Sequence, residues 1–365
     1  MDDTSSSFVC SDNSFLSIIQ DDLVPWDPIN NPYHKGFLTC HTVAFLTFVV
    51  SSATGNLSQV DRLWSILPTM YAWMCVVDSR TRLMACLSTC WSIRLTYNFY
   101  RRGGYTWPPW RGDEDYRWEI LRRGSLGGWW TLLTNQWTMG VFNLVFISLY
   151  QNYLLLAIAT PSLVAWSMAM KGVHCRIGEG GDGVTIVGAP PPLNILDGVA
   201  CFLFVVFLTM EAIADNQQYS FQNKKREWKS RVGTEGGGFA SAIKSISSHT
   251  TFKEYTDGYC QSGLFAIVRK PAYAAEQSIW ISYHLFSVAA SYDSNPTQYW
   301  NWSGVGFVQL CVLFQGSGWL TEQISIAKYP NYRVYQQKVP LYVPRISPVW
   351  HLLVRTTNVE LNKQE

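Results

Sequence analysis

Apolar residues gather in seven long stretches, and short polar segments separate them. A helix needs roughly 20 mostly apolar residues to cross the hydrocarbon core of a bilayer, and each stretch comes near that length. The stretches are residues 37–54, 62–78, 83–100, 136–158, 193–214, 272–291 and 304–322. The second is short and contains Pro68, whereas the fifth is the most uniformly apolar. The pattern predicts an all-α fold, a polytopic integral membrane bundle of about seven transmembrane helices.

Polar segments at the two ends and one internal insert set the expected domain organisation. Residues 1–36 form an acidic N-terminal extension, residues 37–345 the transmembrane domain, and residues 346–365 a C-terminal tail. Gly and Ser are frequent near 229–258, which predicts a flexible cytosolic insert. The apolar segment Pro161–Met170 is too short to cross a bilayer, so we expect an interfacial or packing element there.

Composition strengthens the membrane interpretation. Charged residues make up only 15% of the 365 residues, against about 25% in ordinary soluble domains. Aromatic residues also reach 15%, and Trp and Tyr favour the two membrane–water interfaces. The net charge of +2 argues against a nucleic-acid partner, and the apolar runs argue against intrinsic disorder.

Cysteine and histidine usage predicts neither a metal site nor a disulfide framework. The nine cysteines are an odd number without a CxxC pair, and several lie inside apolar runs. The six histidines are scattered and form no HxxxH pair. No GxGxxG motif follows a predicted strand, so a Rossmann dinucleotide site is not expected. We expect buried, unpaired cysteines and no bound metal.

Lysine and arginine are distributed unevenly among the loops, which orients a membrane protein because basic loops stay cytosolic. Three segments, 101–125, 215–270 and 321–365, contain six, nine and six of these residues. Residues 171–192 contain two, and residues 292–303 contain none. Seven spans would place the basic loops and the C-terminus in the cytosol.

Two features need a separate explanation in this topology. Arg80 and Arg82 fall in a short turn predicted to be non-cytosolic, so either the turn is misplaced or the arginines are paired. Asn56 and Asn301 begin Asn-X-Ser glycosylation sequons, but one lies on the predicted cytosolic side and the other within a few residues of a span. We expect neither sequon to be used.

Ionisable residues at membrane depth are costly and are functional candidates by default. Glu211 and Asp215 stand one helical turn apart near the end of the fifth span, so both carboxylates lie on one helix face. Gln217 and Gln218 follow directly. The cluster predicts a polar pocket mouth that binds ribose hydroxyls or amides; the alternative is a solvated helix end.

A second cluster enters the sixth span with the sequence RKPAYAAEQ. Arg269 and Lys270 are suited to gripping phosphates at the cytosolic surface. Tyr273 and Glu276 share a helix face because they are three residues apart. A helix start that follows a basic stop needs no ligand, and this alternative stays open.

Two further clusters combine aromatic and polar groups. Arg94 lies inside the third span and Tyr97 follows it, although an arginine near a helix end also snorkels to the interface without any ligand. Glu322, the segment Tyr329–Tyr332 and Tyr335 are suited to stacking on a heterocycle or hydrogen-bonding it, or form a plain amphipathic tail.

In their order along the chain, these and other short motifs resemble the DUF1295 branch of the steroid 5α-reductase superfamily. No single motif is specific, but the order is kept across residues 60–345. The motifs are Asp61–Pro68 with Tyr71-Ala72-Trp73, Trp91 with Arg94–Asn98, Arg102–Tyr105, Glu114–Trp118, Phe142–Leu144 with Tyr150–Asn152, Glu211 with Ala214-Asp215 and Gln218, Gly263–Phe265, Arg269 with Pro271, Tyr273 and Glu276-Gln277, and Tyr329–Tyr332.

The resemblance implies an NADPH pocket built from the last helices and the cytosolic loops. Related enzymes reduce a carbon–carbon double bond conjugated to a carbonyl, in a steroid, sterol or other lipid that enters from the bilayer. By position, the implied cofactor residues are Arg94, Glu211, Asp215, Gln218, Arg269, Lys270, Tyr273, Glu276 and Tyr332. The superfamily, together with the lack of a recognisable presequence, makes the endoplasmic reticulum the expected membrane.

Two departures from the family pattern bear on activity. Lys270 stands where family members commonly have His, which keeps a positive charge but loses acid–base character. The dipeptide Ser65-Ile66 stands where the steroid enzymes carry a Gln-Glu pair with the enone-polarising acid. Tyr71 and Tyr97 are then the candidate catalytic donors; otherwise the substrate differs or reductase activity is absent.

Two other functions stay open at this point. The chain is a catalytically inactive, structural subunit of a membrane complex if the missing acid and Lys270 have abolished the chemistry, and its acidic N-terminus would then dock a partner. It is a membrane methyltransferase if the pocket binds a sulfonium nucleoside without a phosphate chain. Adjacent Arg269 and Lys270 favour a pyrophosphate, and therefore the reductase, over the methyltransferase.

Overall fold

The computed structural model describes residues 27–125, 127–172, 174–177, 184–187, 189–234, 250–292 and 300–345. Most of the predicted N-terminal extension, the centre of the predicted insert and the C-terminal tail lie outside these residues. The chain forms two compact units. Unit 1 is Met1–Val205 with Trp280–Cys311, and unit 2 is Val206–Ile279 with Val312–Glu365.

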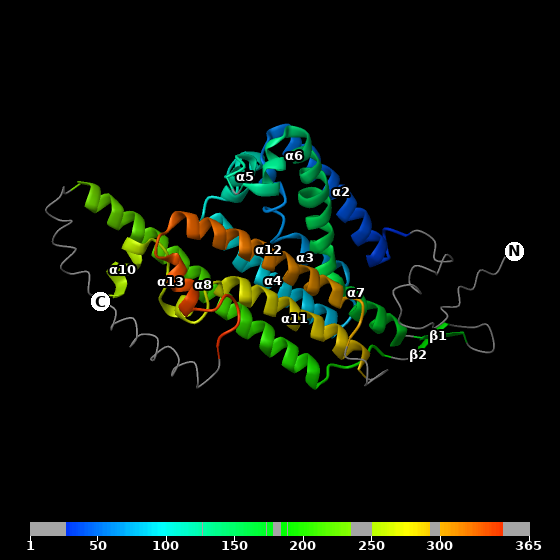
Figure 1. Ribbon diagram of the computed structural model, residues 1–365. Coiled ribbons are helices and arrows are strands. Elements are labelled where there is room, and N and C mark those ends of the chain that lie inside the picture. Colours follow the sequence, from blue (N-terminus) through cyan, green and yellow to red (C-terminus); the bar gives the residue numbers. More distant parts are fainter. Residues whose placement is uncertain are drawn as a thin grey trace. The chain divides into compact units, whose positions relative to one another are not determined.

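The described residues are mostly helical (Figure 1). Unit 1 contains α2 (Pro32–Thr54), η1 (Leu57–Gln59), α3 (Leu67–Met74), α4 (Ser79–Tyr100), η2 (Pro109–Arg111), α5 (Tyr116–Arg122), η3 (Gly128–Thr134), α6 (Gln136–Phe142), η4 (Asn143–Tyr150), α7 (Gln151–Gly172), β1 (His174–Ile177) and β2 (Val184–Val187). Unit 2 contains α10 (Thr250–Asp257), η5 (Gly263–Ala266) and α13 (Tyr332–Lys338). Three long helices contribute to both units: α8 (Ile195–Thr234), α11 (Pro271–Ser291) and α12 (Gly304–Lys328).

Local sequence explains where the first helices begin and end. Asn31 caps α2 by accepting a hydrogen bond from the backbone N–H of Tyr33, and Pro32 suits the first helical position. Gly55, with φ of 69°, ends the same helix in the left-handed conformation that glycine adopts without strain. Asp78 and Thr81 form a reciprocal capping box at the start of α4.

Three helices among the described residues are long and apolar enough to cross a membrane: Pro32–Thr54, Gln136–Lys171 and Ile195–Ser230. They coincide with the predicted first, fourth and fifth spans. The chain is therefore a helical membrane protein. Helices α4, α11 and α12 overlap the predicted third, sixth and seventh spans but are less apolar, because arginine, glutamine, serine and tyrosine interrupt them.

The predicted second span does not form a membrane-length helix. Helix α3 has only eight residues, which is about 12 Å at the rise of an α-helix and less than half the thickness of a bilayer core. Pro68 lies in its first turn, where a proline starts a helix well, so the preceding residues 62–66 form turns instead.

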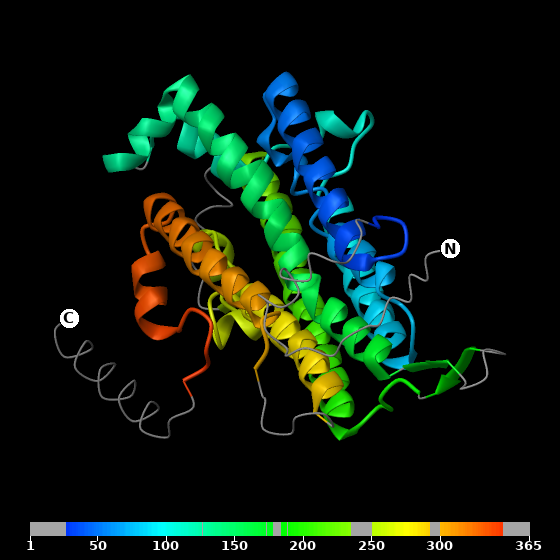
Figure 2. The same ribbon diagram turned by 90° about the vertical axis from the view of Figure 1, so that its right-hand side faces the viewer.

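Segment Pro161–Met170, expected as a separate interfacial element, instead continues α7. Proline inside a helix removes the bond to the carbonyl four residues earlier, which here belongs to Ala157. The hydroxyl of Thr160 donates to that carbonyl at 2.6 Å. This substitute bond allows α7 to pass through the proline. Figure 2 shows α7 (green) alongside α2 (dark blue) in unit 1.

Two further expectations for unit 1 are settled. The prediction of an all-α fold is confirmed, apart from a short antiparallel hairpin in which His174 of β1 pairs with Val187 of β2. The expectation of buried cysteines fails for Cys86 and Cys90, which are exposed on α4.

Of the two arginines in the predicted non-cytosolic turn, Arg80 is paired with an acidic side chain. Its Nε and Nη2 atoms donate to the two carboxylate oxygens of Asp197 at 2.9 and 2.8 Å, and both side chains are almost fully buried. Nη2 also donates to the carbonyl of Pro192 at 2.8 Å. Arg80 therefore secures the start of α8 to the start of α4, whereas Arg82 is exposed.

Candidate functional site

The structure divides the predicted site residues between the two units. Unit 2 contains all the predicted cofactor residues except Arg94, namely Glu211, Asp215, Gln218, Arg269, Lys270, Tyr273, Glu276 and Tyr332. Unit 1 contains Arg94, which is half-buried on α4, and the two predicted catalytic residues, Tyr71 and Tyr97. Eight of the nine cofactor residues thus belong to one compact unit, although they come from three separate helices and from the two residues that precede α11.

Unit 2 buries several carboxylates on its long helices. Glu211 and Asp215 lie one turn apart on α8 and are 4% and 7% exposed. Glu276 on α11 and Glu322 on α12 are similarly buried. Acidic side chains are rarely buried to this extent unless charged or hydrogen-bonding partners replace the lost water. This concentration of buried acceptors distinguishes unit 2 from an ordinary helix bundle.

Arg269 compensates one of these carboxylates. Its Nε donates to Oε2 of Glu322 at 2.9 Å, and its Nη2 lies 2.9 Å from the same oxygen. Its Nη1 donates to the backbone oxygens of Gln336, at 3.0 Å, and Val339. The guanidinium is therefore committed to the protein itself. These contacts give Arg269 a structural role where the sequence suggested a phosphate grip.

Glu322 is the centre of this network, and Tyr332 completes it. The Tyr332 hydroxyl donates to Oε1 of Glu322 at 2.6 Å, and the Gln336 amide donates to Oε2 at 2.6 Å. Burial, followed by the neighbouring carboxylate, raises the pKa of Tyr332, so the phenol keeps the proton that it donates. Tyr332 thereby joins α13 to α12.

A tyrosine cluster surrounds this network outside the predicted spans. The ring of Tyr259 packs 5.0 Å from that of Tyr332 and 5.3 Å from that of Tyr335. The Tyr259 hydroxyl donates to the carbonyl of Asn331 at 3.0 Å, and burial raises its pKa to about 12. Tyr259 follows the Gly- and Ser-rich insert, so no periodic pattern marked it in the sequence.

Lys270 follows Arg269 and directly precedes α11, and Tyr273 lies in the first turn of that helix. The Lys270 ammonium lies 6.0 Å from the centre of the Tyr273 ring, within cation–π range. The Tyr273 ring packs edge-on against Phe314 at 4.7 Å. Lys270 is half-buried. The two cations differ in the surroundings described here: Arg269 pairs with Glu322, whereas Lys270 lies beside an aromatic ring.

The family pattern implied Gln218 as a cofactor residue, but the neighbouring Gln217 is the one with a described structural hydrogen bond. The backbone N–H of Leu264 donates to Oε1 of Gln217 at 3.0 Å, which holds η5 against α8. Gly263 has φ of 60°, and a β-carbon there would overlap the Gln217 amide. Gln218 is half-buried on the same helix.

Tyr71 in unit 1 is enclosed. It is 3% exposed, and its hydroxyl faces the thiol of Cys40 with no further hydrogen-bond partner among the described residues. The adjoining cavity, lined by residues that include Gly36 and Leu156, has a volume of about 10 Å³, which is enough for one water molecule. A lipid carbonyl does not fit beside Tyr71 in this conformation.

Tyr97 in unit 1 is open instead. It is 61% exposed and lines a hollow of about 430 Å³ on the outer side of α4. The other lining residues are Ser92, Ile93, Thr96, Tyr100 and Tyr105. The hollow is open on one side, and its lining is largely apolar. Tyr97 is thus the more accessible of the two predicted donors.

Ser65 directly precedes the position of the missing acid, and its partners Thr96 and Tyr105 line this hollow. Its Oγ is 3.2 Å from the Tyr105 hydroxyl and accepts a hydrogen bond from Thr96 at 2.8 Å. The Tyr105 hydroxyl also donates to the carbonyl of Arg62 at 2.9 Å. The sequence marks Tyr105 only as the end of the motif Arg102–Tyr105 and not as a site residue, because its hydroxyl meets Ser65 only through the fold.

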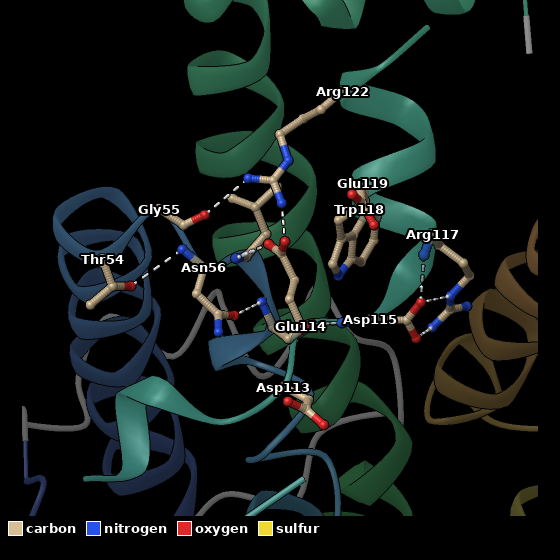
Figure 3. Close-up of polar contacts among 12 residues, drawn as sticks. Thr54, Gly55, Asn56, Asp113, Glu114, Asp115, Arg117, Trp118, Glu119 and Arg122 are labelled. Atoms are coloured by element: carbon tan, nitrogen blue, oxygen red, sulfur yellow. Dashed lines mark hydrogen bonds and ion pairs between the residues drawn. The ribbon is translucent and has the colours of Figure 1, made fainter. Parts of the chain in front are cut away.

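The family motif at residues 114–118 has a structural explanation (Figure 3). Glu114 accepts a hydrogen bond from the backbone N–H of Leu57 at 2.8 Å and forms an ion pair with Arg122. Asp115 caps α5 and pairs with Arg117 at 2.8 Å. These contacts fasten α5 to the end of α2 and to η1.

Both sequon asparagines are engaged in internal hydrogen bonds. The side-chain amide of Asn56 donates to the carbonyl of Gly112 at 2.8 Å. That of Asn301 is buried and donates to Ser287 at 2.9 Å. Glycosylation would require breaking these bonds, in agreement with the expectation that neither sequon is used.

Comparison with known proteins identifies the family. The family model described as "Protein of unknown function (DUF1295)" matches residues 47–177 and 183–339. A Schizosaccharomyces pombe protein described as uncharacterized is 32% identical over 324 residues, which cover 87% of this chain and 80% of the relative. No solved structure matches the chain. The chain therefore belongs to the DUF1295 family, within the steroid 5α-reductase-like superfamily.

Proposed function

We propose that the protein is an NADPH-dependent membrane reductase that acts on a carbon–carbon double bond conjugated to a carbonyl in a steroid, sterol or other lipid. The single observation that carries the proposal is the burial of Glu211, Asp215 and Glu276 in unit 2. Ionisable groups that a membrane protein retains at such cost commonly serve a ligand.

The residues of unit 2 suit the ribose and nicotinamide groups of NADPH better than its phosphates. Buried carboxylates are acceptors for ribose hydroxyls and for the nicotinamide amide. The phosphates need cations, and with Arg269 engaged this task passes to Lys270. NADPH, when bound, would supply the hydride. The protein would orient the cofactor through Glu211, Asp215 and Glu276 and neutralise phosphate charge through Lys270.

The substrate side of the proposal rests on the hollow of unit 1. An apolar hollow beside α4 suits a hydrophobic substrate that arrives from the bilayer. Tyr97 would donate a hydrogen bond to the substrate carbonyl, because its hydroxyl is accessible whereas that of Tyr71 is enclosed. We further propose that the C-terminus lies in the cytosol and that the endoplasmic reticulum is the host membrane.

One observation favours the inactive-subunit alternative. The Arg269 guanidinium is used by Glu322 and by two backbone carbonyls, so the cationic site for a pyrophosphate is smaller than the sequence suggested. A chain that had lost its cofactor would keep this network, because it stabilises unit 2 without any ligand.

The proposal is tested by ligand-induced stabilisation of the detergent-purified protein. A ligand that binds only the folded state raises the melting temperature in a concentration-dependent way. We expect a shift with NADPH, none with S-adenosylmethionine, and loss of the shift in Glu211→Gln. The matched control is Glu227→Gln, which removes an exposed carboxylate from the same helix. Absence of any NADPH shift in a well-folded sample would favour the inactive subunit, and a shift with S-adenosylmethionine alone the methyltransferase.

A further inference from the structure

Basic side chains from two distant segments converge in unit 2, away from the candidate cofactor residues. Lys225, Arg226 and Lys229 lie near the end of α8, and Lys328 ends α12. Lys225 is close enough to the other three for their charges to act on it. We call these four residues the basic patch.

The patch is held in place by specific contacts. The Lys225 ammonium donates to the carbonyl of Gly258 at 2.9 Å, and it lies 5.3 Å from the centre of the Phe221 ring. The Tyr329 ring centre lies 5.9 Å from the Lys225 ammonium and 5.6 Å from that of Lys328. One aromatic ring therefore fixes two lysines that are about a hundred positions apart in the sequence.

The patch has little internal compensation. Arg226, Lys229 and Lys328 are exposed, and no ion pair engages them within the described part of unit 2. Glu227 is the one carboxylate within the basic segment of α8, and the four cations outnumber it. The nearby acids of α10 have other partners. Ser262 donates to Glu254 at 3.2 Å, and Gln261 and Asn331 donate to Asp257 at 2.8 and 3.0 Å. Four converging cations repel one another, so the site suits an anionic ligand.

The position of the patch relates it to a bilayer surface. Helix α8 continues without a break from its apolar part into the basic segment. Arg226 lies 12 residues beyond Ala214, which is about 18 Å along the axis. The headgroup layer extends about 5–8 Å beyond the hydrocarbon core, and the Debye length adds about 8 Å. A moderately tilted helix therefore brings these side chains to the headgroups of its own leaflet.

We propose that the basic patch binds the phosphorylated headgroup of an anionic phospholipid from the surrounding leaflet. Several cations on two helices suit a headgroup with more than one phosphate, and Phe221 and Tyr329 supply an apolar wall that a free phosphate would not need. The bound lipid would bridge the ends of α8 and α12 and stabilise unit 2. This inference is independent of the proposed reductase activity.

The test is native mass spectrometry of the full chain in detergent with added phosphatidylinositol bisphosphate, phosphatidylserine or phosphatidylcholine. We expect the bisphosphate lipid to bind most tightly, phosphatidylserine less, and phosphatidylcholine least, with affinity falling as salt rises. Each basic residue near a headgroup contributes about fivefold in affinity. The triple variant Arg226→Gln/Lys229→Gln/Lys328→Gln should therefore bind the bisphosphate lipid about 100-fold more weakly. Lys225 is kept because it supports the fold.

The control variant Arg82→Gln/Arg111→Gln/Arg123→Gln removes the same charge from exposed positions of unit 1. It should bind the lipid within about twofold of the unmodified chain, since these side chains lie outside the patch. An equal loss in both variants would overturn the proposal, because net charge alone would then explain binding. Binding of soluble inositol trisphosphate as tight as that of the lipid would also overturn it. Circular dichroism of both variants checks that they are folded.

Discussion

Replacing Glu322 by glutamine separates a structural role of Arg269 from a cofactor role. The substitution keeps the shape of the side chain but removes the negative charge that faces the guanidinium. The two side chains are 11% and 6% exposed, so solvent screens the pair only slightly. Removing one partner of a buried ion pair costs about 3–5 kcal/mol, because the other charge stays buried without compensation. Tyr332 donates to one carboxylate oxygen and Arg269 to the other, and the single oxygen of the amide can replace only one of them. We therefore expect the middle of this range, about 4 kcal/mol.

A loss of this size lowers the melting temperature by on the order of 10 °C, and thermal unfolding in detergent measures it. The control is the double variant Arg269→Gln/Glu322→Gln, which removes both charges together. It should be more stable than the sum of the single changes predicts, by about 2 kcal/mol. A Glu322→Gln variant that melts within 2 °C of the unmodified chain and binds NADPH more tightly would refute the reasoning. Arg269 would then be a ligand-binding residue that Glu322 restrains.

Three further results are expected. Asp197→Asn should destabilise the protein by about 3 kcal/mol in thermal unfolding, since it leaves its arginine partner buried without a counter-charge; a loss below about 1 kcal/mol would contradict this. Gly306→Ala should lower the melting temperature because its β-carbon would overlap the carbonyl of Ala157, whereas Gly316→Ala, with open space around its β-carbon, should leave it unchanged or raise it. The folded-state pKa of Tyr259 is raised to about 12 from its ordinary value near 10. Its contribution to stability is therefore complete below pH 10 and is lost as the pH rises towards 12, so Tyr259→Phe should flatten the fall in melting temperature over that window.

The helices that the sequence predicts best are those whose apolar character is uniform. Helices α2 and α8 and the long segment that ends with α7 coincide with apolar stretches, because burial in a bilayer leaves a continuous signal. Helix α3 was overestimated because hydropathy counts the apolar residues on both sides of Pro68, whereas the proline allows a helix only after it. The continuation through Pro161 was missed because the rescue depends on one hydroxyl, that of Thr160.

The polar residues of the candidate site show a sharper limit. Adjacent Arg269 and Lys270 look equivalent in the sequence, since both are cations at a helix start. The fold separates them. The carboxylate that engages Arg269 belongs to Glu322, 53 positions later, and the backbone N–H of Arg269 donates to the carbonyl of Pro340 at 2.8 Å. Residue type and spacing report which groups share a helix face, but they do not report which partner another helix brings. The same limit applies to Arg80, for which pairing was one of two options until Asp197 was placed beside it. Long-range partners therefore decide what a buried charge of this chain does, and the role of Arg269 follows from Glu322 rather than from its neighbour in the sequence.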